Sequence, residues 1–273
     1  MLSRAILGLL PRHARLDGRV RFDGADLTRL EPGALRRLRG RSLAVVFQDP
    51  MTSLNPFMRI SKQLMEVTRL HLGHTKQQAR KHAIRMLEQV GIPDASERAD
   101  SYPHEFSGGM RQRAAIAMAL ACEPSVLVAD EPTTALDVMV QAQILELLDG
   151  LCRDFGLALV LVTHDLPVVA QLCDRAAVMY AGEIVEEGPV ERLYHSPRHP
   201  YTRLLFAATP DLADDGAPVA SIPGAPPRLD RPLVGCPFRP RCDRAFGRCA
   251  EERPLLRRVD GSRAACHLND VPA

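Results

Sequence analysis

The sequence predicts an α/β protein with a parallel sheet, an inserted helical subdomain and a small loop-rich C-terminal domain. Aliphatic runs, rich in β-branched residues, occur at 42–47, 126–129, 158–163 and 176–180. Runs without polar alternation are typical of strands covered on both faces, as in a parallel sheet. Helical patterns separate these runs, and the repeated order of strand, helix and strand indicates an α/β fold.

The domain organisation follows from changes of character along the chain. The text from about 55 to 121 is helical, and 75–90 is strongly amphipathic, which predicts a helical subdomain inserted into the α/β body. After Tyr201, prolines and glycines crowd in and no long periodic element follows. We therefore expect one domain over residues 1–200 and a C-terminal domain over 201–273, whose core is too small to stand alone.

Composition narrows the class of protein. The 273 residues carry 35 Lys and Arg against 33 Asp and Glu, a balance that argues against a dedicated nucleic-acid binder. The sequence contains no apolar run of about 18 residues, the length that would predict a membrane-spanning helix. The apolar start is short, and Pro11-Arg12-His13 after it is no signal-peptide cleavage site, so we interpret it as the tail of a buried helix. The expected location is the cytosol, with membrane attachment only through a partner.

Two carboxylates, Asp130 and Glu131, end the strand predicted at 126–129. Ligands of open α/β sheets bind at the carboxyl ends of the strands. The first acid suits a Mg²⁺ held against nucleotide phosphates, and the second suits a base for an attacking water. The competing interpretation is a solvated acidic turn.

A Ser-Gly-Gly segment, Ser107 to Gly109, lies directly before a predicted helix. The glycines allow close approach of a ligand to the backbone, and a helix amino end attracts anions. A plain N-capped helix start is the alternative for this segment alone.

Further polar residues mark successive strand ends. Gln48 follows the first strand, Asp137 follows the paired acids, and His164 ends the strand at 158–163. In this order the residues resemble the ATP-binding-cassette (ABC) ATPases over roughly residues 20–194. Residues 107–112 look like the signature motif of that family.

The resemblance implies roles for these residues, with ATP and Mg²⁺ as cofactors. Asp130 would assist Mg²⁺, Glu131 would be the general base, His164 would touch the γ-phosphate, and Gln48 would link the metal to the helical subdomain. The signature and D-loop residues would serve the ATP site shared with an opposing subunit: Ser107, Gly108, Gly109, Gln112 and Asp137.

The family's P-loop, Gly-x-x-x-x-Gly-Lys-Ser/Thr, does not occur in this sequence. The three lysines, Lys62, Lys76 and Lys81, all follow Gln48, and glycine precedes none of them. Three explanations stay open: a wrongly assigned start, a fragment or decaying gene, or a subunit that completes only a partner's site. Taken as written, the 273-residue chain is expected to bind ATP poorly and to be unstable alone.

Two further stretches resemble one branch of the family, the dipeptide, oligopeptide and nickel importers. These are residues 47–56 and His199-Pro200-Tyr201-Thr202, with Ile222-Pro223-Gly224 beyond them. The resemblance implies a peptide importer ATPase at the cytoplasmic face of the membrane. Its partners would be a second ATPase subunit, identical or different, two membrane permease subunits and, indirectly, an extracytoplasmic peptide-binding protein.

Four cysteines, Cys236, Cys242, Cys249 and Cys266, cluster near the end with spacings C-x5-C, C-x6-C and C-x16-C. In a reducing cytosol such a cluster suggests a metal rather than disulfides. The tight knuckles typical of zinc sites are absent, and four loosely spaced thiolates suit a cubane cluster at least as well. Some members of the subfamily look similar here and hold a [4Fe–4S] cluster. Zinc and unmetallated thiols are the alternatives.

Two rival classes of function remain. Soluble relatives in DNA repair or translation carry long coiled-coil insertions or tandem cassettes, and this chain has neither. A non-catalytic interaction subunit is compatible with the missing P-loop.

Overall fold

The computed structural model divides into two compact units, Met1–His164 and Asp165–Ala273. It describes residues 1–49, 53–134, 136–209, 221–230 and 232–270. Residues 50–52 of the stretch that resembles peptide importers, together with Ala135 and the C-terminal prolines at 210 and 218, lie outside the described residues. The division falls well before residue 200, where the sequence predicted a boundary. The reason is that the strand at Glu183–Pro189 pairs with the strand at Ser262–Ala264, so it belongs with the second unit.

Three of the predicted strands form the parallel sheet of the first unit. They are β3 (Leu43–Val46), β4 (Val126–Asp130) and β5 (Ala158–Val162), in the order β3-β4-β5. Because all three run in one direction, their carboxyl ends lie at the same edge. Gln48, Glu131 and His164 come shortly after the ends of β3, β4 and β5, and so lie at this edge.

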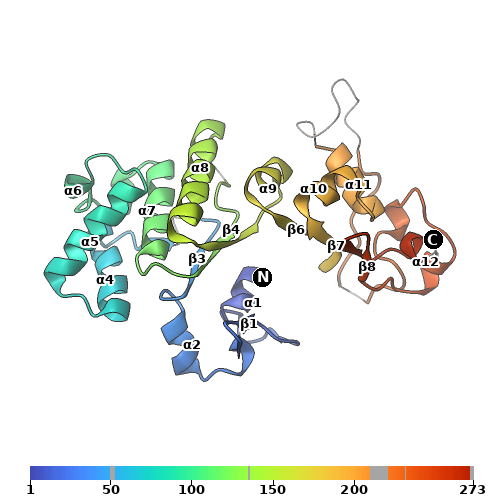
Figure 1. Ribbon diagram of the computed structural model, residues 1–273, viewed down its shortest axis with the longest axis horizontal. Helices are drawn as coiled ribbons and strands as arrows, with labels where there is room; N and C mark the ends of the chain where they lie inside the picture. Colours follow the sequence, from blue (N-terminus) through green and yellow to red (C-terminus); the bar gives the residue numbers. More distant parts are fainter. Residues whose placement is uncertain (50–52, 135, 210–220, 231, 271–273) are drawn as a thin grey trace. The chain divides into compact units, whose positions relative to one another are not determined.

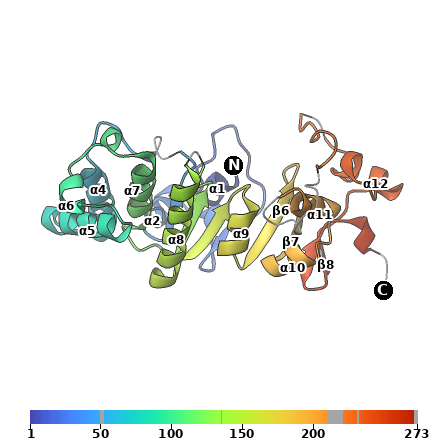
Figure 2. The ribbon, with the colours of Figure 1, turned by 90° about the horizontal axis from the view of Figure 1, so that it is seen from above.

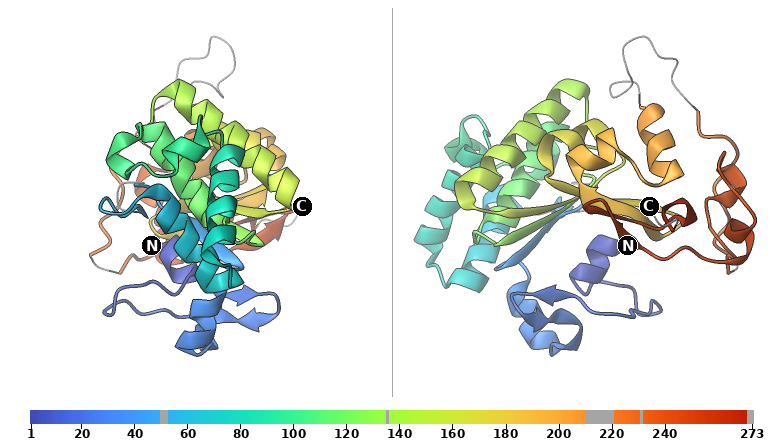
Figure 3. Two further views of the ribbon diagram at one scale, coloured as in Figure 1. Left: turned by 90° about the vertical axis from the view of Figure 1, so that its left-hand side faces the viewer. Right: turned by 45° about the vertical axis from the view of Figure 1, so that its right-hand side comes forward.

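Helices cover both faces of this sheet. The long helix α8 (Val138–Phe155) connects β4 to β5 and lies over one face, and α1 (Leu2–Ile6) lies at the other (Figure 3). Asp137 caps the start of α8, and Gly156 ends it with a φ of 59°. Ile144 and Leu148 of α8 are fully buried in the main core.

The predicted helical subdomain is present beside the sheet (Figure 1). A Thr75–Gln78 capping box, in which each side chain bonds the other residue's backbone N–H, starts its second helix. Leu64, Leu87 and Ile116 join its helices in the core shared with the sheet. The elements are α4 (Ile60–Leu72), α5 (Lys76–Gln89), α6 (Ala95–Arg98), the 3₁₀ turn η2 (Pro103–Glu105) and α7 (Gly108–Leu120).

A small hairpin layer completes the first unit. Its own core contains Leu7, Leu27 and Leu43. Arg39 ties it to the first helix by donating to the carbonyl oxygens of Leu7, at 2.7 Å, and Gly8, at 2.9 Å. The elements are β1 (Arg21–Phe22), β2 (Ala25–Asp26), η1 (Leu27–Arg29) and α2 (Pro32–Leu38).

The second unit contains an antiparallel sheet in the order β6-β7-β9-β8. The sequence predicted that the run at 176–180 would join the parallel sheet. This prediction is wrong, because the run forms a strand of the antiparallel sheet. Ala181 and Gly182 both have positive φ, 51° and 83°, which closes a two-residue hairpin between β6 and β7. The strands are β6 (Arg175–Tyr180), β7 (Glu183–Pro189), β8 (Arg257–Val259) and β9 (Ser262–Ala264).

Short helices pack around this second sheet (Figure 2). They are α9 (Leu166–Leu172), α10 (Val190–His195), α11 (Pro200–Ala207), η4 (Arg239–Arg241), α12 (Arg248–Glu251) and η5 (His267–Asn269). Val178, Tyr180, Val185 and Phe238 form the core. Among the described residues of either unit, no helix has the length and apolar character needed to cross a membrane.

Candidate active site

Three of the predicted site residues meet at the carboxyl edge of the parallel sheet. Gln48 Nε2 donates to Glu131 Oε2 at 2.7 Å, and His164 Nδ1 lies 3.2 Å from Glu131 Oε1. Each of the three follows a different strand, so the sheet itself brings them together. Glu131 is the centre of this arrangement.

A fourth residue, Thr134, was not anticipated from the sequence. Its hydroxyl donates to Glu131 Oε2 at 2.8 Å. This hydrogen bond is the main cause that lowers the pKa of Glu131, with a further contribution from His164. The carboxylate is therefore held in the ionised form that a base needs. The sequence signal that could have indicated this contact is a hydroxyl residue three positions after the strand-end carboxylate.

The backbone at Glu131 is unusual for a residue with a side chain. Its φ is +49°, in the left-handed region, which non-glycine residues adopt rarely and mostly at functional sites. Its N–H donates to the carbonyl oxygen of Val162 at 2.7 Å, just past the end of β4. The turn thus directs Glu131 away from the strand while the neighbouring strand holds its backbone.

Asp130, the other strand-end acid, is held by a residue of the first helix, α1. Its Oδ2 accepts a hydrogen bond from the hydroxyl of Ser3, which is 1% exposed on α1. The sequence predicted this helix only as the apolar tail of a buried helix, with no role for Ser3. A lone serine among its apolar residues was the signal.

The Ser-Gly-Gly segment starts α7 next to the start of α8. Ser107 Oγ accepts from the N–H of Met110 at 3.3 Å, and Asp137 Oδ1 accepts from Val140 at 3.0 Å. A Cβ on Gly109 would lie only 2.7 Å from Cγ1 of Val140, whereas one on Gly108 would meet nothing closer than 3.8 Å. Glycine at 109 is therefore required by packing between the two helices.

This difference gives a paired prediction for the two glycines. Gly109→Ala should lower the free energy of unfolding by about 1–3 kcal/mol, because Val140 must shift. Gly108→Ala should be neutral or slightly stabilising, because alanine favours a helix and has room here. Urea unfolding of both variants measures this. Equal effects at the two positions would contradict the packing account.

Gln112, which the resemblance placed among the nucleotide-binding residues, lies inside the helical subdomain. Its side chain is 1% exposed, and its Nε2 has no partner among the described residues. The structure thus places Gln112 apart from Ser107 and Gly108, which are exposed at the helix start.

The four clustered cysteines line one small cavity of about 10 Å³ in the second unit, together with His199, Phe238 and His267. Burial raises the pKa of Cys236 and Cys242, and raises that of Cys266 to about 11. Within the described part of the chain, no group of three or more His, Cys, Asp or Glu side chains is placed to hold a metal ion. The thiols share a cavity but do not form a ready ligand set, so the predicted iron–sulfur centre has no geometric support here.

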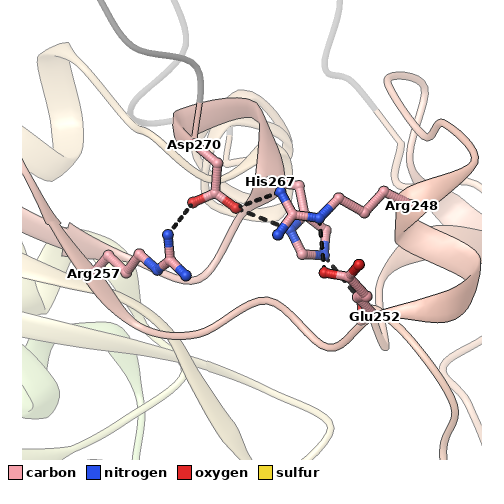
Figure 4. Close-up of polar contacts among 5 residues, drawn as sticks. All are labelled: Arg248, Glu252, Arg257, His267 and Asp270. Carbon is pink, nitrogen blue, oxygen red and sulfur yellow. Dashed lines mark hydrogen bonds and ion pairs between the residues drawn. The ribbon is translucent and has the colours of Figure 1, made fainter.

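An ion network joins the segments that carry two of these cysteines (Figure 4). Asp270 Oδ2 lies 3.0 Å from Arg248, next to Cys249, and 3.2 Å from Nδ1 of His267, next to Cys266. Arg257 pairs with the other oxygen at 3.2 Å. The hydrogen bond from His267 is the main cause that lowers the pKa of Asp270. The network stabilises one side of the cavity.

His199 in the cavity wall makes stability depend on pH. Burial lowers its pKa from 6.5 to about 4. Because the folded pKa lies below the unfolded one, the stability that neutral His199 confers is complete above pH 6.5 and is lost as the pH falls to 4. Since a tenfold change in proton affinity is worth about 1.4 kcal/mol, the loss totals about 3 kcal/mol.

Urea unfolding between pH 7.5 and pH 4 measures this loss, with His199→Asn as the control that has no imidazole to protonate. The variant should lose less stability over the range, because all other titrating groups are shared. Identical pH dependence in the two proteins would contradict the prediction.

Comparison with known proteins gives the family. The sequence pattern of the ABC transporter family matches residues 1–134, and that of the oligopeptide/dipeptide transporter C-terminal region matches 185–249. The oligopeptide transport ATP-binding protein OppD of Salmonella typhimurium is 49% identical over 262 residues, which are 96% of this chain and 78% of that protein. The chain belongs to the ATP-binding proteins of ABC transporters.

Other relatives agree with this family. The dipeptide transport ATP-binding protein DppD of Escherichia coli is 49% identical over 268 residues, 97% of this chain and 82% of its own. Among solved structures, a dimeric ATP-binding cassette, MJ0796, bound to ADP and Pi is similar with a TM-score of 0.61 and 28% identity, over 69% of this chain and 79% of that chain. The predicted fold and family are confirmed. The protein is an ATPase by family, with ATP and Mg²⁺ as the family's cofactors.

Proposed function

We propose that this chain powers the uptake of peptides across the cytoplasmic membrane as an ATPase subunit of an ABC importer. The observation that carries the chemistry is the convergence of Gln48, Thr134 and His164 on the ionised carboxylate of Glu131. Peptides as cargo follow from the likeness to OppD and DppD.

In this function, Glu131 accepts a proton from, or orients, the water that attacks the γ-phosphate of ATP. His164 and Gln48 hold the carboxylate and face the same edge of the sheet. Asp130, held by Ser3, is the residue that would bind Mg²⁺. When bound, the ion neutralises phosphate charge.

A second ATPase subunit is the proposed partner at the start of α7 and α8. Val138 and Met139, directly after Asp137, are 81% and 72% exposed, and Ser107 and Gly108 are exposed close by. An apolar pair on the surface beside phosphate-binding backbone suits a subunit interface. The similar cassette MJ0796 is a dimer. Two permease subunits would hold the pair at the cytoplasmic face of the membrane, with the peptide-binding protein outside.

A non-catalytic role is the second candidate, because this exposed surface could complete a partner's site without local hydrolysis. Both candidates are tested by assembling the importer in proteoliposomes and measuring peptide uptake with ATP hydrolysis. His164→Ala in this chain should abolish most hydrolysis if its own site works. If His164→Ala has no effect while Ser107→Arg abolishes uptake, the non-catalytic role holds. If His164→Ala keeps full hydrolysis and Ser107→Arg keeps full uptake, both candidate functions are contradicted.

For the cysteine cavity we propose a bound [4Fe–4S] cluster, with zinc as the alternative. The support is the residue type alone: four cysteines line one cavity, and thiolates are ligands that both groups accept, while the described side chains are not placed as a ligand set. Cys236, Cys242, Cys249 and Cys266 would be the ligands, and the bound group would cross-link a tail with a small core. Anaerobic purification with iron, sulfide and zinc analysis tests this: about four iron atoms per chain support the cluster, and one zinc without iron contradicts it.

A further inference from the structure

Positive charge is concentrated in α1 and the hairpin layer of the first unit. Residues 1–41 contain ten arginines against four acids, whereas the rest of the chain contains 25 Lys and Arg against 29 Asp and Glu. The near balance of the whole chain is therefore not shared by this region. Arg39 is half-buried, and the other nine arginines are exposed: Arg4, Arg12, Arg15, Arg19, Arg21, Arg29, Arg36, Arg37 and Arg41.

The hairpin layer turns arginines of β1 away from the sheet. The layer lies on the side of the sheet opposite α8 (Figure 3), and its core includes Leu43 of β3, so this core lies between the layer and the sheet. Val20 and Phe22 pack against the core. Because neighbouring side chains of a strand face opposite ways, Arg21 points outward, and Arg19, two positions earlier, is exposed as well.

Helix α2 presents a second pair of arginines in the same way. Leu35 and Leu38 pack against the core of the layer, and Arg36 and Arg37 between them are exposed. Because a helix turns by about 100° per residue, the two positions between these leucines lie on the opposite side of the helix. The outer side of the layer therefore carries four arginines, which we call the arginine face: Arg19, Arg21, Arg36 and Arg37.

The protein itself does not neutralise this charge. Of the nine exposed arginines, only Arg29 lies within ion-pair distance of an acid among the described residues, 3.5 Å from Asp26. Arginines of the second unit differ, since Arg203 and Arg263 pair with acids at 2.7 and 2.8 Å. Surface charge of one sign that has no internal partner attracts ligands of the opposite sign. The arginine face thus suits an anionic partner.

The apolar residues of this region indicate which anionic partner fits. Leu9 and Leu16, in the loop before β1, are 40% and 46% exposed and flank Arg12 and Arg15 in sequence. Phe22, the one Phe, Tyr or Trp of residues 1–41, packs inward. Single-stranded nucleic acids are bound by exposed aromatic rings on which bases stack, whereas anionic membranes attract basic residues accompanied by aliphatic ones. Exposed leucines without exposed aromatic rings favour the membrane.

We propose that the arginine face and the adjoining loop at 9–19 dock directly on an anionic phospholipid surface. The guanidinium groups pair with lipid phosphates, and Leu9 and Leu16 enter the headgroup region. This contact goes beyond the proposed function, in which permease subunits hold the chain at the membrane. It is a second attachment to the same membrane, and its strength depends on lipid charge.

The test is co-sedimentation of the purified full chain with vesicles, without ATP or permease subunits. One set of vesicles contains equal parts of phosphatidylglycerol and phosphatidylcholine, and the other contains phosphatidylcholine alone. Wild type should bind the anionic vesicles much more tightly, and this binding should weaken as salt is added. Equal binding to both sets, or binding to anionic vesicles that salt does not change, would overturn the inference whatever the variants do.

Two fourfold variants locate the contact. Glutamine at all four positions of the arginine face should weaken binding to anionic vesicles about 10²-fold or more, because each basic residue near such a surface contributes about fivefold. The matched control removes the same charge from the helical subdomain and should bind nearly as wild type, since distant charges are screened. It replaces four exposed residues by glutamine: Lys62, Arg69, Lys76 and Lys81. Equal losses in the two variants would show that charge alone, and not this face, determines binding.

Leu16→Ser separates a membrane from a nucleic acid. The variant should weaken binding to anionic vesicles about tenfold, because a partly exposed leucine no longer enters the headgroup region. If Leu16→Ser binds the vesicles as wild type does, and a duplex RNA fragment displaces wild type from them, the face binds nucleic acid and the inference is wrong. Because the assay contains no ATP and no permease, its failure leaves the proposed peptide uptake untouched.

Discussion

Replacing Glu131 with glutamine should lower the rate of ATP hydrolysis by about 10²–10⁴, the usual contribution of a general base. The substitution keeps the size of the side chain and an oxygen that can accept from Thr134, but it removes the charge that Gln48, Thr134 and His164 surround. The fold should therefore survive while proton acceptance is lost. Turnover by the assembled importer, at saturating ATP, is the measurement.

Two further variants show whether the carboxylate itself is responsible. Asp149 on α8 is an exposed acid paired with Arg153 at 2.9 Å, and Asp149→Asn should leave turnover unchanged. Thr134→Val should raise the pKa of Glu131, because the hydroxyl is the main group that lowers it. The acidic limb of the pH–rate profile should then move to higher pH. Normal turnover in Glu131→Gln would exclude Glu131 as the base.

The parts of this site that could be predicted from sequence are those that local pattern determines. Buried runs predicted β3, β4 and β5, and parallel strands place their ends together. The sequence placed Gln48, Glu131 and His164 at the ends of successive strands, and the parallel arrangement explains why they are neighbours. The resemblance to ABC ATPases added roles to these positions.

The parts that could not be predicted depend on contacts between distant segments. The bond from Ser3 to Asp130 joins residues 127 positions apart, and no local pattern indicates it. The run at 176–180 is as apolar as the parallel strands, yet the turn at Ala181 and Gly182 pairs it antiparallel with β7. The sequence suggested only a ligand-binding role for Gly109. Its packing against Val140 could not be predicted, because Val140 lies on a different helix.

The same dependence on distant contacts makes Glu186 a key residue of the second unit. It is fully buried in β7, between Val178 on β6 and Ala264 on β9. Its two carboxylate oxygens accept from the backbone N–H groups of Arg198, at 2.6 Å, and His199, at 2.9 Å. A buried carboxylate thus connects the sheet to the segment that begins α11.

Glu186→Ala should lower the free energy of unfolding by about 3–4 kcal/mol, because two buried N–H donors lose a charged acceptor. Glu186→Gln, which keeps one acceptor oxygen, should lose clearly less. The neighbour Glu187 provides the matched control: it pairs with Arg263 at 2.8 Å near the surface, and Glu187→Ala should cost less than about 1 kcal/mol. Urea unfolding of the three variants measures these values.

Hydrogen exchange can locate the loss. In Glu186→Ala the amides of Arg198 and His199 should exchange much faster, because they no longer have an acceptor, while amides of β3 and β4 in the first unit keep their protection. Since His199 also forms the wall of the cysteine cavity, its thiols should react faster with an alkylating reagent in this variant. Unchanged exchange at Arg198 and His199 would show that Glu186 does not hold the start of α11.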